Sequence, residues 1–181
     1  MNATSQTNTR PTTTLLRLAG AVRESYVDGP GIRFALFTQG CPHNCHGCHN
    51  PETHDFNGGY ETTAEHIAAE IIKTPGSGIT FSGGEPFCQA EALAEVIRLV
   101  RAKKKASLIV YTGYRAEQLI TLAKTDCGVK ALLTEANYII DGRYEEGLRD
   151  LTLRFRGSSN QRIMDFHCYP NSENVYEIDN F

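Results

Sequence analysis

The chain has 181 residues, of which 40% are hydrophobic and 22% are charged, as expected of one globular domain of about 100–200 residues rather than of a disordered chain. No apolar run approaches the roughly 18–20 residues of a bilayer-spanning helix, which excludes a transmembrane protein. Lys and Arg total 18 against 21 for Asp and Glu, and the net charge of −3 argues against nucleic acid as a partner.

Residues 1–14 open the chain with a segment rich in Thr, Asn and Ser. It contains no apolar core of a secretory signal, so we expect a disordered leader in a cytoplasmic protein. Its single Arg and its lack of acidic residues leave a mitochondrial transit peptide as the alternative.

Strands and helices are predicted to alternate after the leader. β-Prone residues predict strands at 15–22 and 32–38, and the aperiodic stretch 39–60 that follows predicts a long loop. Thr62 and Glu65 form a capping box, which predicts a helix through residue 73. The same patterns predict strands at 79–82, 108–112 and 138–141, and helices at 90–104 and 116–124.

This alternation favours right-handed βαβ crossovers and a parallel sheet covered by helices, which is an α/β fold. The roughly four to six strands are too few for a closed eight-stranded barrel of about 250 residues, which leaves an open sheet or an incomplete barrel. In both, ligands collect at the carboxyl ends of the strands, where the loops at 39–60, 83–88 and 113–115 emerge. Residues 165–181 are polar and acidic and are expected to form a peripheral C-terminal tail.

Six cysteines are the unusual feature of the composition, and Cys41, Cys45 and Cys48 lie together in a C-x3-C-x2-C segment. In a reducing compartment, clustered thiols are more often metal ligands than disulfides. Four residues span at most about 13–14 Å, so the three sulfurs can converge on one small inorganic body. An iron–sulfur cluster is favoured, and three Cys ligands would leave one iron of a four-iron cubane open to a small molecule.

Other assignments of these thiols remain open. A closed zinc site would use the three thiolates and one histidine of the same loop, His43, His46 or His49, and unliganded thiols are the remaining possibility. Outside the loop, Cys88, Cys127 and Cys168 stand alone, and we expect them to be small core residues rather than a fourth ligand.

A second motif, Gly83-Gly84-Glu85, follows the predicted strand at 79–82. Paired glycines let a ligand approach the backbone closely, and a carboxylate suits an ammonium group. Alone, this sequence would be an ordinary turn. Beside a three-Cys loop at the same sheet edge, it predicts a ligand site.

The two motifs together resemble those of the radical S-adenosylmethionine (SAM) enzymes, whose fold is an incomplete TIM-type α/β barrel and whose three-Cys cluster holds SAM on its open iron. Residues 28–33, 48–51 and 113–114 resemble, more narrowly, the activases that install a glycyl radical on another enzyme. Among these, residues 141–143 and 154–161 are similar to the activating proteins of anaerobic ribonucleoside-triphosphate reductase. The resemblance runs from about residue 15 to 163, and it implies a radical SAM activase domain at 15–164.

The resemblance also implies the roles of particular residues. The metal ligands would be Cys41, Cys45 and Cys48, which hold one 4Fe–4S cluster. The cofactor-binding residues would be Gly47, Cys48 and His49 at the nucleoside of SAM, and Gly83, Gly84 and Glu85 at its methionine amino group. No catalytic acid or base is implied, because the cluster and SAM carry the chemistry.

The function that the resemblance implies is that of an oxidoreductase which cleaves SAM reductively and generates the glycyl radical on anaerobic ribonucleoside-triphosphate reductase. Its partners would be that reductase and a low-potential electron donor such as flavodoxin or ferredoxin. The sequence has Gly47 where many radical SAM enzymes carry an aromatic residue, and His49 follows the last Cys, as in the pyruvate formate-lyase activases. An activase of another glycyl-radical enzyme is therefore the alternative, followed by a Cys3His zinc module and a simple electron-transfer protein.

Overall fold

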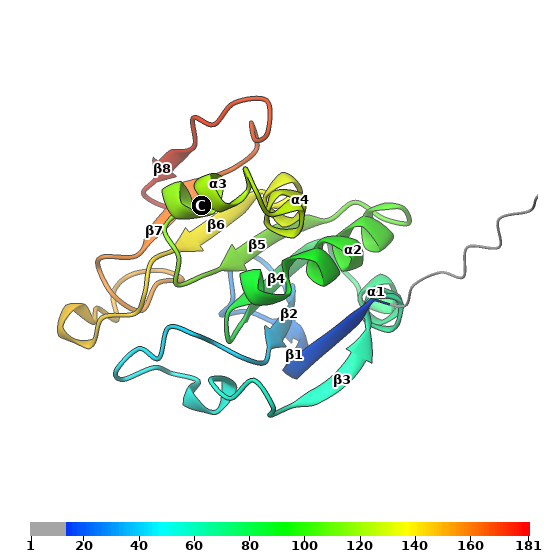
Figure 1. Cartoon of the computed structure of the whole chain (residues 1–181), viewed down its shortest axis with the longest axis horizontal. Helices are drawn as coiled ribbons and strands as arrows, with labels where there is room; N and C mark the ends of the chain where they lie inside the picture. The colour runs from blue at the N-terminus through cyan, green and yellow to red at the C-terminus, as the bar shows by residue number, and fades with distance from the viewer. Residues whose placement is uncertain (1–13) are drawn as a thin grey trace, which may run out of the picture.

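The structure, a computed structural model, describes residues 14–181. The predicted leader, residues 1–14, therefore lies outside the described residues except for Thr14. The described chain forms an eight-stranded sheet in the order β3-β1-β2-β4-β5-β6-β7-β8 (Figure 1). Its strands are β1 (Leu15–Ser25), β2 (Arg33–Thr38), β3 (Tyr60–Thr63), β4 (Gly78–Gly83), β5 (Ser107–Tyr111), β6 (Tyr138–Asp141), β7 (Arg162–Asp165) and β8 (Tyr176–Ile178).

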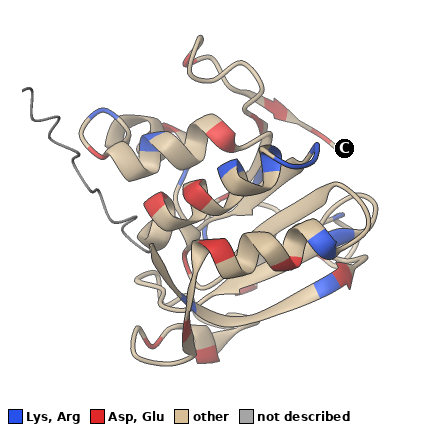
Figure 2. Ribbon diagram, turned by 90° about the vertical axis from the view of Figure 1, so that its right-hand side faces the viewer, with Lys and Arg blue, Asp and Glu red and all other residues tan. Residues whose placement is uncertain are grey.

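Four α-helices of the described chain pack on one face of this sheet through a shared apolar core. They are α1 (Ala64–Lys73), α2 (Ala90–Arg101), α3 (Ala116–Leu122) and α4 (Cys127–Glu135). In α1 and α2, acidic residues occupy the first turn and basic residues the last turn, as the helix dipole favours (Figure 2). Within residues 14–181, no helix combines the length and apolar character needed to cross a bilayer.

The centre of the sheet is parallel and its two sides are antiparallel. Strands β2, β4, β5 and β6 run in one direction, whereas β1 and β3 on one side and β7 and β8 on the other pair antiparallel. Side chains alternate between the faces: Leu108 and Val110 join the core beneath the helices, and Ile109 packs with Ile140 and Ile163 on the opposite face. The result is a mixed α/β fold, and the incomplete barrel stays a prediction.

Three predicted helix boundaries differ from the structure, one of them at the end of α3, which stops at Leu122 instead of residue 124. The predicted capping box is wrong by one residue. Thr62 lies in β3, where it pairs with Leu16 of β1, and it is Thr63 that caps α1, by accepting a hydrogen bond from the His66 N–H at 3.2 Å. The helix predicted at 90–104 ends at Arg101, because the Lys103 N–H donates to the Val100 carbonyl at 2.9 Å, an i→i−3 bond that closes the last turn of α2.

The sequence patterns did not reveal α4, β3 or β8. Gly128 interrupts the helical pattern of α4, which is capped by Asp126, whose carboxylate accepts a hydrogen bond from the Val129 N–H at 3.0 Å. The expected boundary of the C-terminal tail, at residue 165, falls at the end of β7. Beyond it the chain contributes the buried ring of Phe166 and strand β8 to the fold.

Candidate functional site

Two loops meet at the carboxyl edge of the parallel strands: the cysteine loop, residues 39–59, and the glycine turn, residues 83–85. The parallel register of β2 and β4 places Thr38 beside Gly83. Beyond this pair, the Gly84 N–H donates to the Thr38 carbonyl at 2.8 Å and the Glu85 N–H donates to the Gly40 carbonyl at 2.9 Å. The two sequence motifs are therefore hydrogen-bonded to each other through their backbones.

The glycines of this turn are required by contact with the cysteine loop. Gly83 has a φ of +93°, and a Cβ added there would lie 2.6 Å from the Thr38 nitrogen. A Cβ added to Gly84 would lie 2.4 Å from the Gly40 carbonyl oxygen. The sequence suggested that the glycines admit a ligand. The structure gives a more immediate reason, which is that two protein backbones lie too close together for any side chain.

Cys41, Cys45 and Cys48 line one cavity of about 110 Å³, which we call the thiol hollow. The cysteine loop curls around it through left-handed backbone at Asn44 and Gly47, with φ of 47° and 70°. The other walls come from loops that follow β2, β4, β5 and β6: His43, Thr53, His54, Ser82, Gly83, Gly84, Tyr111, Thr112, Gly113, Gly142, Arg143, Tyr144 and Gln161. The structure thus brings the three predicted ligands together with the paired glycines.

A larger cavity of about 410 Å³, which we call the outer cleft, adjoins the thiol hollow. The two cavities share lining residues, among them Cys48, Gly83 and Tyr144. The remaining walls of the outer cleft include Val27 and Phe155. The thiols therefore lie at the inner end of a space large enough to admit an organic ligand beside an inorganic group.

The three residues predicted to contact the nucleoside of SAM have different surroundings in the structure. Cys48 lines both cavities, and His49 lines the outer cleft, where its ring lies 4.9 Å from that of Tyr144. Gly47 is exposed, and a Cβ added to it would meet the side chain of Glu146. Gly47 therefore turns the loop, and it lines neither the hollow nor the cleft.

Glu85 is placed in the wall of the site rather than on its surface. Its carboxylate is 0% exposed and accepts hydrogen bonds from the Thr112 hydroxyl at 2.9 Å and the Gly113 N–H at 2.9 Å. It also accepts from the Phe87 N–H at 3.0 Å and lies 2.7 Å from His43 Nε2. All of these partners belong to the protein, and the predicted contact of Glu85 with an amino group stays a prediction.

The three histidines considered as zinc ligands have other surroundings. His43 is paired with Glu85, and His46 is 93% exposed on its side chain and lies 2.8 Å from Glu146. His49 packs on Tyr144 in the outer cleft. Within residues 14–181, no group of three or more His, Cys, Asp or Glu side chains is placed to hold a single metal ion.

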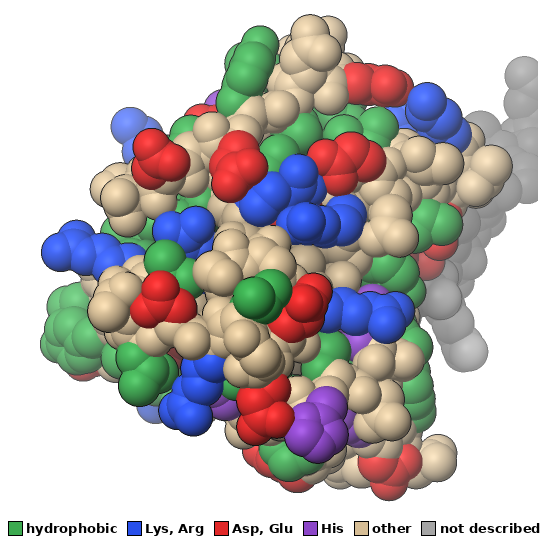
Figure 3. Space-filling view, turned by 90° about the vertical axis from the view of Figure 1, so that its left-hand side faces the viewer, with side chains coloured by type: hydrophobic (Ala, Val, Ile, Leu, Met, Phe, Trp, Pro, Cys, Tyr) green, Lys and Arg blue, Asp and Glu red, His purple; other side chains and the backbone are tan. Residues whose placement is uncertain are grey.

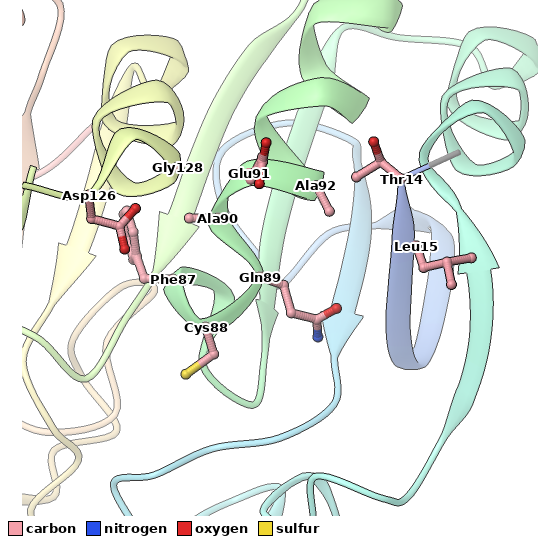
Figure 4. A pocket seen from close by; sticks show the side chains of 10 residues that line it. All are labelled: Thr14, Leu15, Phe87, Cys88, Gln89, Ala90, Glu91, Ala92, Asp126 and Gly128. Carbon is pink, nitrogen blue, oxygen red and sulfur yellow. The ribbon is translucent and has the colours of Figure 1, made fainter. Parts of the chain in front are cut away.

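The isolated cysteines are not core residues, and that prediction is wrong. Cys88, Cys127 and Cys168 are all exposed. Cys88 lines a separate cavity of about 380 Å³ between the start of β1 and the first turns of α2 and α4, together with Gln89 and Asp126 (Figure 4). Neither the paired glycines nor the three clustered thiols line this cavity, so it lies apart from the site.

Burial controls the electrostatics of the thiol hollow in the metal-free protein. Burial raises the pKa of the Cys41 and Cys45 thiols, so both are neutral at pH 7 until a metal displaces their protons. Arg143 lines the hollow and acts in the opposite direction on Cys45. Its guanidinium is suited to a ligand carboxylate, a role that the sequence motif at 141–143 did not specify.

Buried polar atoms without partners lie around both cavities. They are Nε2 of His54, a residue that lines the thiol hollow, and Nε of Arg156, a residue that lines the outer cleft; a third such atom, Asn160 Oδ1, belongs to a residue that lines neither. Leaving such an atom unpaired costs about 1–3 kcal/mol, so these positions are where a bound group would find partners. Three thiols around one hollow, with a buried donor beside them, fit a 4Fe–4S cluster, in which each thiolate binds its own iron.

This chain is similar to one protein family and to several known proteins. A family of 4Fe–4S single cluster domains matches residues 27–164. An anaerobic ribonucleoside-triphosphate reductase-activating protein of Vibrio cholerae is 36% identical over 149 residues, which cover 77% of this chain and 92% of the relative. The protein of that name from Enterobacteria phage T4 is 31% identical over 160 residues, or 85% and 94% of the two chains. A pyruvate formate-lyase-activating enzyme of Clostridium pasteurianum is 40% identical over 94 residues, or 49% and 40% of the two chains.

Proposed function

We propose that this chain, which belongs to the family of anaerobic ribonucleoside-triphosphate reductase-activating proteins and contains a 4Fe–4S single cluster domain, is a radical SAM activase that generates the glycyl radical on that reductase. The observation that carries the proposal is the shared wall between the thiol hollow and the outer cleft. In the proposal, the thiol hollow takes the cluster on Cys41, Cys45 and Cys48, and the adjoining outer cleft takes SAM and a segment of the partner.

The residues of the chain have separate tasks in this reaction. Cys41, Cys45 and Cys48 would hold the cluster, which would supply the electron for reductive cleavage of SAM and so the radical chemistry that reaches the glycine of the partner. The Gly83 backbone, open to the hollow, lets the amino-acid end of SAM approach closely, and Arg143 offers its guanidinium to the carboxylate. Tyr144, in the wall of both cavities, limits the access of water to the reacting centre.

The electron comes from a low-potential donor in the cytoplasm such as flavodoxin or ferredoxin, because a sulfonium accepts an electron only from a strong reductant. No residue of this chain acts as a general acid or base in the proposal. The positions that matter for chemistry are therefore those that hold, orient and shield the two cofactors.

Activation of a different glycyl-radical enzyme, of the pyruvate formate-lyase type, is the second candidate. His49 after the last Cys favours it, as does the 40% identity to a pyruvate formate-lyase-activating enzyme over about half of this chain. The first candidate rests on relatives that match across 92% and 94% of their own length.

The test has two stages, both anaerobic. The protein is reconstituted with iron and sulfide, reduced in the presence of SAM, and assayed for 5′-deoxyadenosine and methionine. It is then incubated with purified anaerobic ribonucleotide reductase or with pyruvate formate-lyase, and the glycyl doublet is followed by electron paramagnetic resonance (EPR). A doublet on the reductase is expected. A doublet only on the lyase would favour the second candidate, and a protein that takes up zinc and cleaves no SAM would overturn both.

A further inference from the structure

We infer that His54 is a cluster-contacting residue: its Nε2–H donates a hydrogen bond to a sulfur of the cluster held by Cys41, Cys45 and Cys48, and so raises the reduction potential of that cluster. The inference rests on the cluster in the proposed function. It concerns a residue outside the C-x3-C-x2-C segment, and its test does not depend on activity.

The position of His54 is fixed by backbone contacts with the start of the cysteine loop. The His54 carbonyl accepts the Cys41 N–H at 3.2 Å, and the neighbouring Thr53 carbonyl accepts the Gly40 N–H at 2.8 Å. The Thr53 hydroxyl in turn donates to the Asn50 carbonyl at 2.7 Å. Backbone hydrogen bonds therefore hold His54 beside Cys41, although thirteen positions separate the two residues along the chain.

The imidazole of His54 has a vacant hydrogen-bonding position. Nε2 is buried and has no partner in the protein, whereas the Nε2 of His43 lies 2.7 Å from Glu85 and the Nδ1 of His46 lies 2.8 Å from Glu146. His54 also lines the thiol hollow together with the three cysteines. Buried polar atoms in native proteins are almost always paired, and the proposed partner of Nε2 is a group seated in the hollow that His54 lines.

The chemistry of the missing partner follows from the residues around it. An imidazole nitrogen that carries a proton donates to sulfur, and the group with sulfur acceptors in the hollow is the one that the three thiolates hold. Reduction adds negative charge to that group, and a hydrogen bond stabilises the reduced form more than the oxidised form. The donor therefore raises the potential, and removing it makes the cluster harder to reduce.

The first test compares potentials by EPR-monitored redox titration of reconstituted protein without SAM. His54→Phe keeps a ring of similar shape and removes the donor, whereas His54→Gln keeps an N–H at a similar reach. We expect a potential more negative than wild type for His54→Phe, a smaller shift for His54→Gln, and none for the exposed control His66→Phe on α1. An unchanged potential in His54→Phe, at equal iron and sulfide content, would overturn the inference.

A second measurement uses the wild-type protein, so that it does not depend on the Phe variant assembling a cluster. With 15N-labelled histidine, pulsed EPR of the reduced cluster without SAM should detect a weakly coupled nitrogen that is lost in His54→Gln. No coupling, or coupling only after SAM is added, would overturn the inference while reconstitution and SAM cleavage leave the proposed function intact. A wild-type chain that takes up no cluster would overturn both.

Discussion

Glu85 shows how one buried side chain can connect the parts of this site. Its carboxylate has partners on three segments: His43 in the cysteine loop, Phe87 just beyond the glycine turn, and Thr112 with Gly113 after β5. A carboxylate accepts through both oxygens, so it satisfies all of these donors at once. Glu85 therefore ties the cysteine loop to two neighbouring strand ends.

The amide variant Glu85→Gln should weaken this connection. The new NH2 group would face donors that now point at a carboxylate oxygen, which leaves buried groups unpaired at a cost of about 1–3 kcal/mol. We expect a lower melting temperature of the metal-free protein and reduced iron uptake on reconstitution. The control Glu146→Gln alters a half-exposed carboxylate beside His46 and should change stability by less than about 0.5 kcal/mol. Equal melting temperatures for the two variants would contradict the linking role.

Three of the six cysteines are proposed cluster ligands, and the other three are not. Cys41→Ala, Cys45→Ala and Cys48→Ala should each lose most of the iron bound on reconstitution, and with it the formation of 5′-deoxyadenosine, because a cubane with two protein ligands is open to disassembly. Cys127→Ala is the matched control, since this thiol is exposed at the start of α4. A requirement for Cys127 in cluster assembly would mean that all four irons have protein ligands.

At the scale of elements, the site depends on the contact between the cysteine loop and the glycine turn. Gly84→Ala tests that contact, because the new Cβ would lie 2.4 Å from the Gly40 carbonyl oxygen. Backbone atoms must move to relieve this overlap, at a cost of about 1–3 kcal/mol. We expect a lower melting temperature and lower iron uptake together, since the displaced loop carries the three thiols.

Gly20→Ala provides the comparison, because a Cβ at this position on β1 meets nothing within 4 Å. It should leave the melting temperature and the iron content close to those of the wild type. A Gly84→Ala variant that bound iron normally and lost only affinity for SAM would contradict this role. The glycine would then be needed for SAM binding, as the sequence suggested, and the backbone contact would contribute little to stability.

For the whole molecule, the sequence predicted which motifs would meet but not how they are held together. Both motifs directly follow strands, and parallel strands end at one edge, so the approach of Cys41 to Gly84 could be predicted from the pattern alone. The pairing of His43 with Glu85 could not be predicted, because it also depends on where the loop after β5 lies. His54 carries no motif, and only burial without a partner distinguishes it.

The fold likewise contains strands that the local sequence predicts and strands that it does not. The parallel strands contain runs of β-prone residues bounded by turn residues, which made β2, β4, β5 and β6 predictable from local sequence. Strands β3 and β8 are three or four residues long and largely exposed, so they depend on pairing with β1 and β7 rather than on their own residues. Short edge strands of this kind have too little local pattern for any rule of periodicity.

The last prediction concerns the partner, which must insert a glycine-bearing segment at the loop-rich edge of the sheet. Viewed from that side, the surface mixes hydrophobic, acidic and basic side chains (Figure 3). Val27 lines the outer cleft and is 77% exposed, so a partner segment entering the cleft would cover it. Val27→Asp would leave a charge against that segment, and we expect at least about a tenfold lower yield of the glycyl doublet, equivalent to ~1.4 kcal/mol of docking energy. The yield of 5′-deoxyadenosine without the partner should fall far less than the yield of the doublet, because Val27 is 77% exposed and does not line the thiol hollow. The control is Leu122→Asp, a change at a residue that lies at the end of α3 and is 41% exposed; this variant should give the wild-type yield of the glycyl doublet.

If the Val27→Asp variant also gave the wild-type yield of the doublet, the partner would have to approach the cluster by a route that does not cover Val27.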